Sequence, residues 1–527
     1  MKTFSWFRYG LLCLSVTLFC STSVYAQETD ITQTPNVANA GIKKSLADQV
    51  GAGRGDINTP DSSLFLITRD PFRSIARGRQ LFQRKYTVAE GFGPRTNDGI
   101  GDIETDGSLG AGLVDSCAGC HGRPKGSAGF GGNVFTRPDS RDAPHLFGLG
   151  IIEMLADEIT SDLRAIQDNA ILVAQQRNRR VFRRLTSKGI NFGTIRVSPN
   201  GSVDASRVEG VDPDLRVRPL FHQGGTISIR EFVVGALNAE MGLEAFDPDL
   251  AAAARGERVV TPSGMVLNGA LDQIEAPPVS SAADDFDSDG VANEVQVSLV
   301  DHLEFYLLNY FKPGLYQQTN TTRKGKKLFQ QIRCTGCHIP DLVIDHDRRV
   351  ADVETVYDKQ GVFNDLFATA APLFTDQEDG TGHPSLKRPL GQAFVVKNIY
   401  ADFKRHDLGP AFHERNFDGT ITKEFVTEPL WGVGTTPSYG HDGRSINLRE
   451  VIRRHGGEAR QSKQRFFQLR ANDQHAILEF LNALVLFGPP DTSSNLNPGD
   501  ANTPGFPQNG HGSIDLSVLF NDPSDKE

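Results

Sequence analysis

The sequence has few cysteines, few tryptophans and almost no strongly hydrophobic stretch. Six cysteines and two tryptophans occur in 527 residues, so a pattern among the cysteines is informative. The one strongly apolar stretch is LLCLSVTLFC at 11–20, and no later segment is apolar enough to cross a membrane. Acidic residues outnumber basic ones, giving a formal charge of −10, which argues against the basic face that nucleic-acid binding normally requires.

Several catalytic motifs are also missing. The sequence contains no GxSxG nucleophile motif, no Walker loop and no HExxH zinc helix. The 53 glycines and 28 prolines instead indicate long irregular connections in an otherwise ordinary globular composition. The negative charge suits a surface that steers a basic redox partner, although it is also normal for solubility.

The N-terminus predicts export. MKTFSWFRYG supplies a basic start, the apolar stretch follows, and Val24-Tyr25-Ala26 precedes Gln27, as in a signal peptide cleaved after Ala26. A membrane anchor is the alternative, but the apolar stretch is short for a span. Acylation of Cys20 is disfavoured by the bulky pair Leu18-Phe19. We expect a periplasmic or extracellular protein with no transmembrane segment after cleavage.

The remaining cysteines form two pairs, each followed by histidine. Cleavage removes Cys13 and Cys20, and leaves CAGCH at 117–121 and CTGCH at 334–338. Redox dithiols or half of a zinc site are conceivable, but CxxCH is typical of covalent haem attachment, in which both sulfurs form thioethers and the histidine ligates iron. The sequence therefore predicts two haem c groups, held by Cys117, Cys120 and His121 and by Cys334, Cys337 and His338.

An internal repeat precedes the two haem motifs. SIARGRQLFQRKYT at 74–87 matches TTRKGKKLFQQIRCT at 321–335, and each half resembles a class I cytochrome c unit. We therefore predict a mainly α fold of two class I cytochrome c-like haem domains with long loop-rich insertions. The expected segments are a signal peptide at 1–26, an N-terminal arm at 27–70, haem domains at 71–310 and 311–490, and a flexible tail at 491–527.

An acidic loop could bind calcium. DDFDSDGVANE at 284–294 places Asp285, Asp287 and Asp289 on alternate positions before Gly290, which is the spacing of a calcium loop. The twelfth position, normally a bidentate Glu, is Gln296. A solvated acidic turn is the competing interpretation.

Seven motifs together resemble one family. The sequence is similar to bacterial di-haem oxidoreductases (putative peroxidases), relatives of di-haem cytochrome c peroxidases, the methylamine-dehydrogenase maturation enzyme and rubber oxygenases. The likeness spans about residues 70 to 490. Its motifs are EGFGPRTND at 90–98, SCAGCHG at 116–122, RDAPHLFGLGIIE at 141–153, REFVVGALNAEMGL at 230–243, NYFKPG at 309–314, YADFKRHDLG at 400–409 and TTPSYGHDGRSINLREVIRRHGGEA at 435–459.

The resemblance implies an open first haem. The peroxidases carry a distal histidine in a loop that corresponds here to 122–144, where this sequence has none. An open face is what peroxide or dioxygen requires. His145 could still act as a ligand, or simply pack at a helix start. Glu153 is the candidate catalytic acid/base, with an ordinary helix-face carboxylate as the alternative.

The resemblance also implies the sixth ligand of the second haem. The peroxidases place a methionine fourteen residues after the histidine of the HDG motif; here that position, counted from His441, is His455. A bis-histidine iron is expected to have a lower potential than a His/Met iron. Tyr439 is the competing ligand, although the family places a haem-packing aromatic residue there.

The peroxidases hold a structural calcium near the HDG motif. The peroxidases use an Asn side chain and two main-chain carbonyls, and the matching positions are Asp142, Thr436 and Ser438. Asp in place of the family's Asn keeps an oxygen ligand. The bridging tryptophan of the peroxidases is missing, because the two tryptophans are Trp6 and Trp431. Electrons would then pass between the haems through another residue.

These patterns predict a di-haem c-type oxidoreductase, most simply peroxidase-like. Peroxide would react at the first haem, and a small redox protein such as a cytochrome c or cupredoxin would supply electrons through the second. The alternatives are oxidation or oxygenation of an organic or protein substrate, with dioxygen as oxidant, and a non-catalytic electron-transfer protein.

Overall fold

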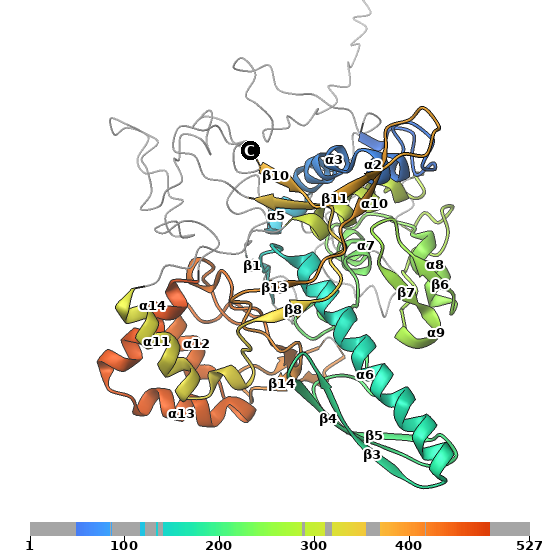
Figure 1. The fold of residues 1–527 in the computed structure, drawn as a ribbon. Coiled ribbons are helices and arrows are strands. Elements are labelled where there is room, and N and C mark those ends of the chain that lie inside the picture. The colour runs from blue at the N-terminus through green and yellow to red at the C-terminus, as the bar shows by residue number, and fades with distance from the viewer. Residues whose placement is uncertain are drawn as a thin grey trace, which may run out of the picture.

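The structure is a computed structural model that describes residues 49–84, 86, 116–121, 133–134, 141–286, 290–310, 319–354, 369–416 and 418–484. Figure 1 shows the arrangement of their helices and strands. The predicted signal peptide at 1–26, the tail at 491–527, and Asp287 and Asp289 of the acidic loop lie outside the described residues. No helix within the described ranges is long and apolar enough to cross a membrane.

The prediction of a mainly α fold built from two class I cytochrome c-like domains is wrong. Among the described residues 39% are helical and 17% lie in strands, so the fold is mixed. The strands form small antiparallel sheets, of which β3-β4-β5 has three strands and the others have two. The segments VFRRLTS and INFGTIRV, for example, have buried residues at many alternate positions and pair with each other as an antiparallel hairpin.

The N-terminal half holds the longest helix and the three-stranded sheet. Its helices are α2 (Ser63–Arg69), α3 (Pro71–Gln83), α5 (Cys117–His121), α6 (Leu149–Arg177), α7 (Ile229–Ala239), α8 (Pro248–Ala254), α9 (Gly269–Asp272) and α10 (Val297–Asn309). Its strands are β1 (Asn133–Val134), β2 (Arg141–Asp142), β3 (Val181–Ser187), β4 (Ile190–Val197), β5 (Val203–Val208), β6 (Arg258–Val260) and β7 (Val266–Asn268). Helix α6 packs on β3 and β4, and together they project from the rest of the molecule (Figure 1).

In the C-terminal half a run of short strands lies between α11 (Asn320–Gln331) and the helices α12 (Leu448–Arg454), α13 (Arg460–Gln468) and α14 (Ala471–Asn482). This half also has 3-10 turns at Cys334–Gly336, Val433–Thr435 and Gly457–Ala459. Its strands are β8 (Leu342–Ile344), β9 (Ala351–Glu354), β10 (Thr369–Pro372), β11 (Phe374–Gln377), β12 (Leu386–Pro389), β13 (Phe394–Val396), β14 (Arg405–Asp407), β15 (Glu414–Arg415), β16 (Ile421–Thr422) and β17 (Glu424–Val426).

The repeated sequence motif forms a similar helix crossing twice. In the first, Gly78 of α3 lies against α10 so closely that an added Cβ would be 2.1 Å from the carbonyl oxygen of His302. In the second, Gly325 of α11 meets the carbonyl oxygen of Ala476 on α14, with an added Cβ at 1.9 Å. The motif glycine is therefore required for close backbone approach at each crossing.

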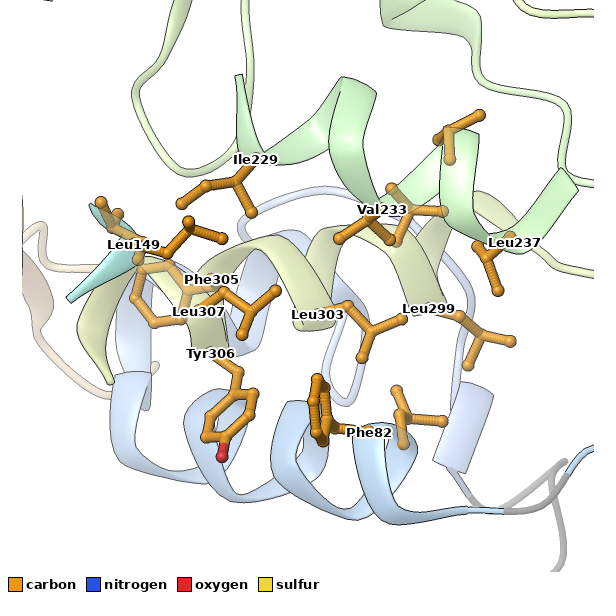
Figure 2. Packing of buried hydrophobic residues seen from close by; sticks show 14 of the residues in the cluster. Phe82, Leu149, Ile229, Val233, Leu237, Leu299, Leu303, Phe305, Tyr306 and Leu307 are labelled. Atoms are coloured by element: carbon orange, nitrogen blue, oxygen red, sulfur yellow. The ribbon is translucent and has the colours of Figure 1, made fainter. Parts of the chain in front are cut away.

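Buried aromatic rings complete both crossings. Phe82 and Tyr306 lie between α3 and α10 with ring centroids 5.8 Å apart, while Ile229, Val233 and Leu237 of α7 cover the other side of α10 (Figure 2). At the second crossing Phe329 and Phe480 lie 5.5 Å apart. Since nearly every residue of α10 is buried, this helix forms the centre of the first core.

Candidate haem-binding sites

The first CxxCH sequence forms the short helix α5. The hydroxyl of Ser116 accepts a hydrogen bond from the backbone N–H of Gly119 at 3.0 Å and so caps its start. The Nδ1 atom of His121 lies 2.8 Å from the carbonyl oxygen of Pro144. Burial lowers the pKa of His121 to about 4 despite this hydrogen bond, so the ring is neutral with Nδ1 as donor.

The second CxxCH sequence is held by the segment that follows β13. His338 places Nδ1 3.0 Å from the carbonyl oxygen of Tyr400. The backbone N–H groups of Ile399 and Ala401 donate to the carbonyl oxygens of Pro340 and Ile339, at 2.9 and 3.1 Å. Burial again lowers the pKa of His338. The segment around Tyr400 therefore fixes the orientation of the imidazole.

His455 lies at the C-terminal end of α12. Its Nδ1 is 2.7 Å from the carbonyl oxygen of Val451, and its ring packs edge-on against Phe412 with centroids 5.4 Å apart. Burial lowers the pKa of His455 to about 4. The competing ligand Tyr439 donates its hydroxyl to the carbonyl oxygen of Val433 at 2.9 Å.

These residues fit haem binding. His121, His338 and His455 each donate Nδ1–H to a backbone carbonyl, which leaves the lone pair of Nε2 for a metal, as is usual for a ligating histidine. The four cysteines of the two CxxCH sequences form no disulfide, and burial raises the pKa of Cys117 and Cys334 to about 12 and that of Cys120 to about 11. The pairs Cys117–Cys120 and Cys334–Cys337 would each hold one haem.

Glu153 is a buried anchor in this structure. Its side chain is 1% exposed, and its two oxygens accept hydrogen bonds from the backbone N–H of Ile229 and from the guanidinium of Arg348, both at 2.6 Å. Burial raises its pKa, while Arg348 opposes the rise. The carboxylate thus joins α6 to the start of α7 and to the segment after β8. Its predicted role as acid/base stays a prediction.

Four histidines gather where β2 meets the HDG segment. His222 places Nδ1 2.9 Å from Glu428 and Nε2 3.2 Å from the carbonyl oxygen of Asp142. His441 stacks on Phe425 with ring centroids 4.0 Å apart and pairs through Nε2 with Glu414 at 3.2 Å. The remaining two are His121, described above, and His145, whose Nε2 lies 3.2 Å from the carbonyl oxygen of Trp431.

The structure places Ser438 beside Asp142 at the predicted cation position. The hydroxyl of Ser438 donates to Asp142 at 3.3 Å, and the N–H of Asp142 donates to the carbonyl oxygen of His441 at 2.8 Å. The hydroxyl of Thr436 instead donates to the carbonyl oxygen of Gly432. Calcium at this position stays a prediction.

The acidic loop is closed by a residue that the sequence did not indicate. Glu244 is fully buried and accepts the backbone N–H groups of Phe286 and, at 3.1 Å, Asn293. Asp285 accepts the N–H of Gly290 at 3.1 Å. The twelfth position, Gln296, is the N-cap of α10. A glutamate some forty residues upstream carries no local signal, because only folding brings it to the loop.

Comparison with known proteins gives one family match. Residues 344–484 match the family described as di-haem oxidoreductase, putative peroxidase. This match confirms the family resemblance. The matched segment contains Asp402, His406, His441 and His455 but neither CxxCH sequence. The family match supports a di-haem redox function and implies haem cofactors.

Curated proteins and solved structures add little. No curated protein sequence matches. Hydrazine synthase of Kuenenia stuttgartiensis aligns over 86% of this chain and 99% of its own, at 12% identity and a TM-score of 0.33. A MauG-like protein associated with microbial copper homeostasis aligns over 56% of this chain and 81% of its own, at 15% identity and a TM-score of 0.23. At these TM-scores neither structure supports an argument about fold or function.

Proposed function

We propose that this chain is an exported di-haem c-type oxidoreductase with peroxidase-like activity. One haem is attached to Cys117 and Cys120, and the other to Cys334 and Cys337. Each bound haem supplies a redox-active iron, while the protein controls ligation, access and proton delivery. A small redox protein, of the cytochrome c or cupredoxin type, delivers electrons at the second site, and hydrogen peroxide is the oxidant at the first.

The observation that carries this proposal is the asymmetry between the two sites. At the second site, His338 and His455 both point Nδ1 at a backbone carbonyl and keep Nε2 for a metal. At the first site only His121 has this arrangement among the described residues. Its neighbour His145 differs, because its Nε2 contacts a carbonyl and its Nδ1 has no hydrogen-bond partner in the described part of the chain, and His222 uses both nitrogens. The first site thus has one histidine with this arrangement where the second has two, and this difference supports a first site that admits a small oxidant.

Two groups are placed to handle protons. Glu428 has a side chain about half exposed, and it pairs with the buried His222 at 2.9 Å. Its partial burial opposes ionisation, but the hydrogen bond from His222 holds the pKa of Glu428 below the usual value. The His222–Glu428 pair is therefore a candidate path for protons. Glu153 is the second candidate, more deeply buried.

Haem content tests the attachment. After expression with a c-type maturation system, we expect two haems per chain, because all four mature cysteines lie in CxxCH sequences. Replacing Cys117 and Cys120 with alanine should halve the haem content measured by pyridine haemochrome absorbance. Replacing Cys334 and Cys337 with alanine should have the same effect. Protein with intact thiols and no Soret band would contradict the proposal.

Peroxide turnover tests the activity. We expect the oxidised protein to show one high-spin and one low-spin signal in electron paramagnetic resonance, and to consume peroxide when a reduced donor is present. If Glu153 acts as acid/base, Glu153→Gln should lower kcat by about 10² to 10⁴ and leave both haem spectra unchanged. A purely structural Glu153 would instead lower the Tm, since Arg348 would lose a buried partner, with kcat changed little.

His222→Gln is the matched comparison, because it breaks the other candidate proton path. Two low-spin signals in every redox state, together with no peroxide consumption, would favour the electron-carrier alternative.

A further inference from the structure

A charged pair lies beside the attachment cysteine of the second site. The Sγ of Cys337, a carboxylate oxygen of Asp402 and a ring nitrogen of His406 all lie within 4.8 Å of one another. Asp402 and His406 are 2% and 6% exposed. His406 places Nε2 2.9 Å from Asp402, and Nδ1 2.7 Å from Glu458. Because a carboxylate faces each ring nitrogen, both nitrogens donate and the ring is an imidazolium.

The same segment that orients His338 fixes this pair. Tyr400 accepts the hydrogen bond from His338, the next residue bonds to the backbone of Ile339, and Asp402 follows, its second oxygen accepting the backbone N–H of Lys404 at 3.0 Å. The pair therefore has a defined position relative to the second site. Burial disfavours the charged ring, but hydrogen bonds with Asp402 and Cys337 raise the pKa of His406 to about 11.

The cysteine, carboxylate and imidazole have the donor types of a metal site, but the proposed haem attachment excludes that role. A thioether cannot act as the thiolate ligand that a cysteine metal site needs. Once the thioether forms, Asp402 and Glu458 alone hold the proton on His406. The charges that remain next to the sulfur are one carboxylate and one imidazolium.

We propose that Asp402 and His406 set the reduction potential of the second haem, the imidazolium cancelling the effect of the buried carboxylate. This inference rests on the haem attachment proposed above. Reduction adds an electron, so a nearby negative charge disfavours it and a nearby positive charge favours it. In a partly buried site at this range, one unit charge changes such an equilibrium by about tenfold. Asp402 and His406 act here as positioning and charge-balancing residues that do not touch the reacting atoms.

Substitution of each member should shift the potential in opposite directions. In spectroelectrochemical titration of the low-spin haem at pH 8, His406→Gln should lower the midpoint by about 59 mV, the equivalent of a tenfold change for one electron. Asp402→Asn should raise it by a similar amount, and the double variant should lie near the wild type. A merely structural pair would give shifts of one sign or none.

The matched control is His413→Gln. His413 also pairs with a carboxylate, that of Asp407 at 2.8 Å, but it is not part of the group around Cys337, so its loss should leave the potential unchanged. Two haems per chain with no opposite shifts would overturn this inference alone. Absence of haem at Cys334 and Cys337 in the wild type would overturn the proposed attachment as well. If His406→Gln does not retain haem, the midpoint of Asp402→Asn is the deciding measurement. A midpoint potential of Asp402→Asn that does not rise above the wild-type value contradicts the inference.

Discussion

Replacing Arg230 with methionine is expected to lower the free energy of unfolding by about 3 to 5 kcal/mol. Arg230 is fully buried and pairs with Asp247 at 2.7 Å, Asp301 at 3.0 Å and Glu304 at 2.8 Å. Its removal leaves these carboxylates buried without their shared cation. Asp301 and Glu304 belong to α10, and Asp247 precedes α8. Loss of Arg230 would therefore loosen the packing of α7 against α10 and α8.

Chemical denaturation followed by circular dichroism measures this effect. Arg196→Met is the control, because Arg196 pairs with Asp204 on the exposed face of the sheet β3-β4-β5, where such a pair contributes about 0 to 1 kcal/mol. Burial raises the pKa of Glu304 to about 7 even with Arg230 present. If proton uptake by the carboxylates fully replaced Arg230, the variant would be as stable as the control, and the expectation would be wrong.

Replacing His455 with alanine is expected to convert the second haem from low-spin to high-spin. Nδ1 of His455 is occupied by the carbonyl of Val451, so only Nε2 is available as ligand, and alanine removes it. Electron paramagnetic resonance should then lose its low-spin signal while the haem content stays at two. The midpoint of that haem should also change, because its sixth ligand is gone.

Tyr439→Phe is the comparison for the competing ligand. Its hydroxyl donates to the carbonyl of Val433, and burial raises its pKa, so it is a neutral donor with a partner already. We expect Tyr439→Phe to keep the low-spin signal. If the signal survives in His455→Ala and disappears in Tyr439→Phe, the assignment of the ligand is reversed.

Patterns local to the chain could be interpreted from the sequence. The CxxCH sequences were recognised from the cysteine spacing alone. The repeat around Gly78 and Gly325 predicted two related helices, and both glycines lie at a helix crossing. The family resemblance also followed from motifs, and the match over 344–484 confirms it. The prediction of the fold class failed because antiparallel pairs such as β8–β13 join strands of only three residues that lie far apart in the sequence.

Partners far apart in the chain were decided by the tertiary structure alone. From the sequence, Glu153 is a carboxylate on a helix with no indicated partner. Folding places Arg348, which is 195 residues further along the chain, beside it. His406 lies in a motif, but the sequence does not show that Glu458 and Cys337 would meet it. Covalent haem attachment depends on residues that are adjacent in the chain, so the sequence by itself was enough to predict it. Charge balance depends on distances in space, which only the packed chain fixes.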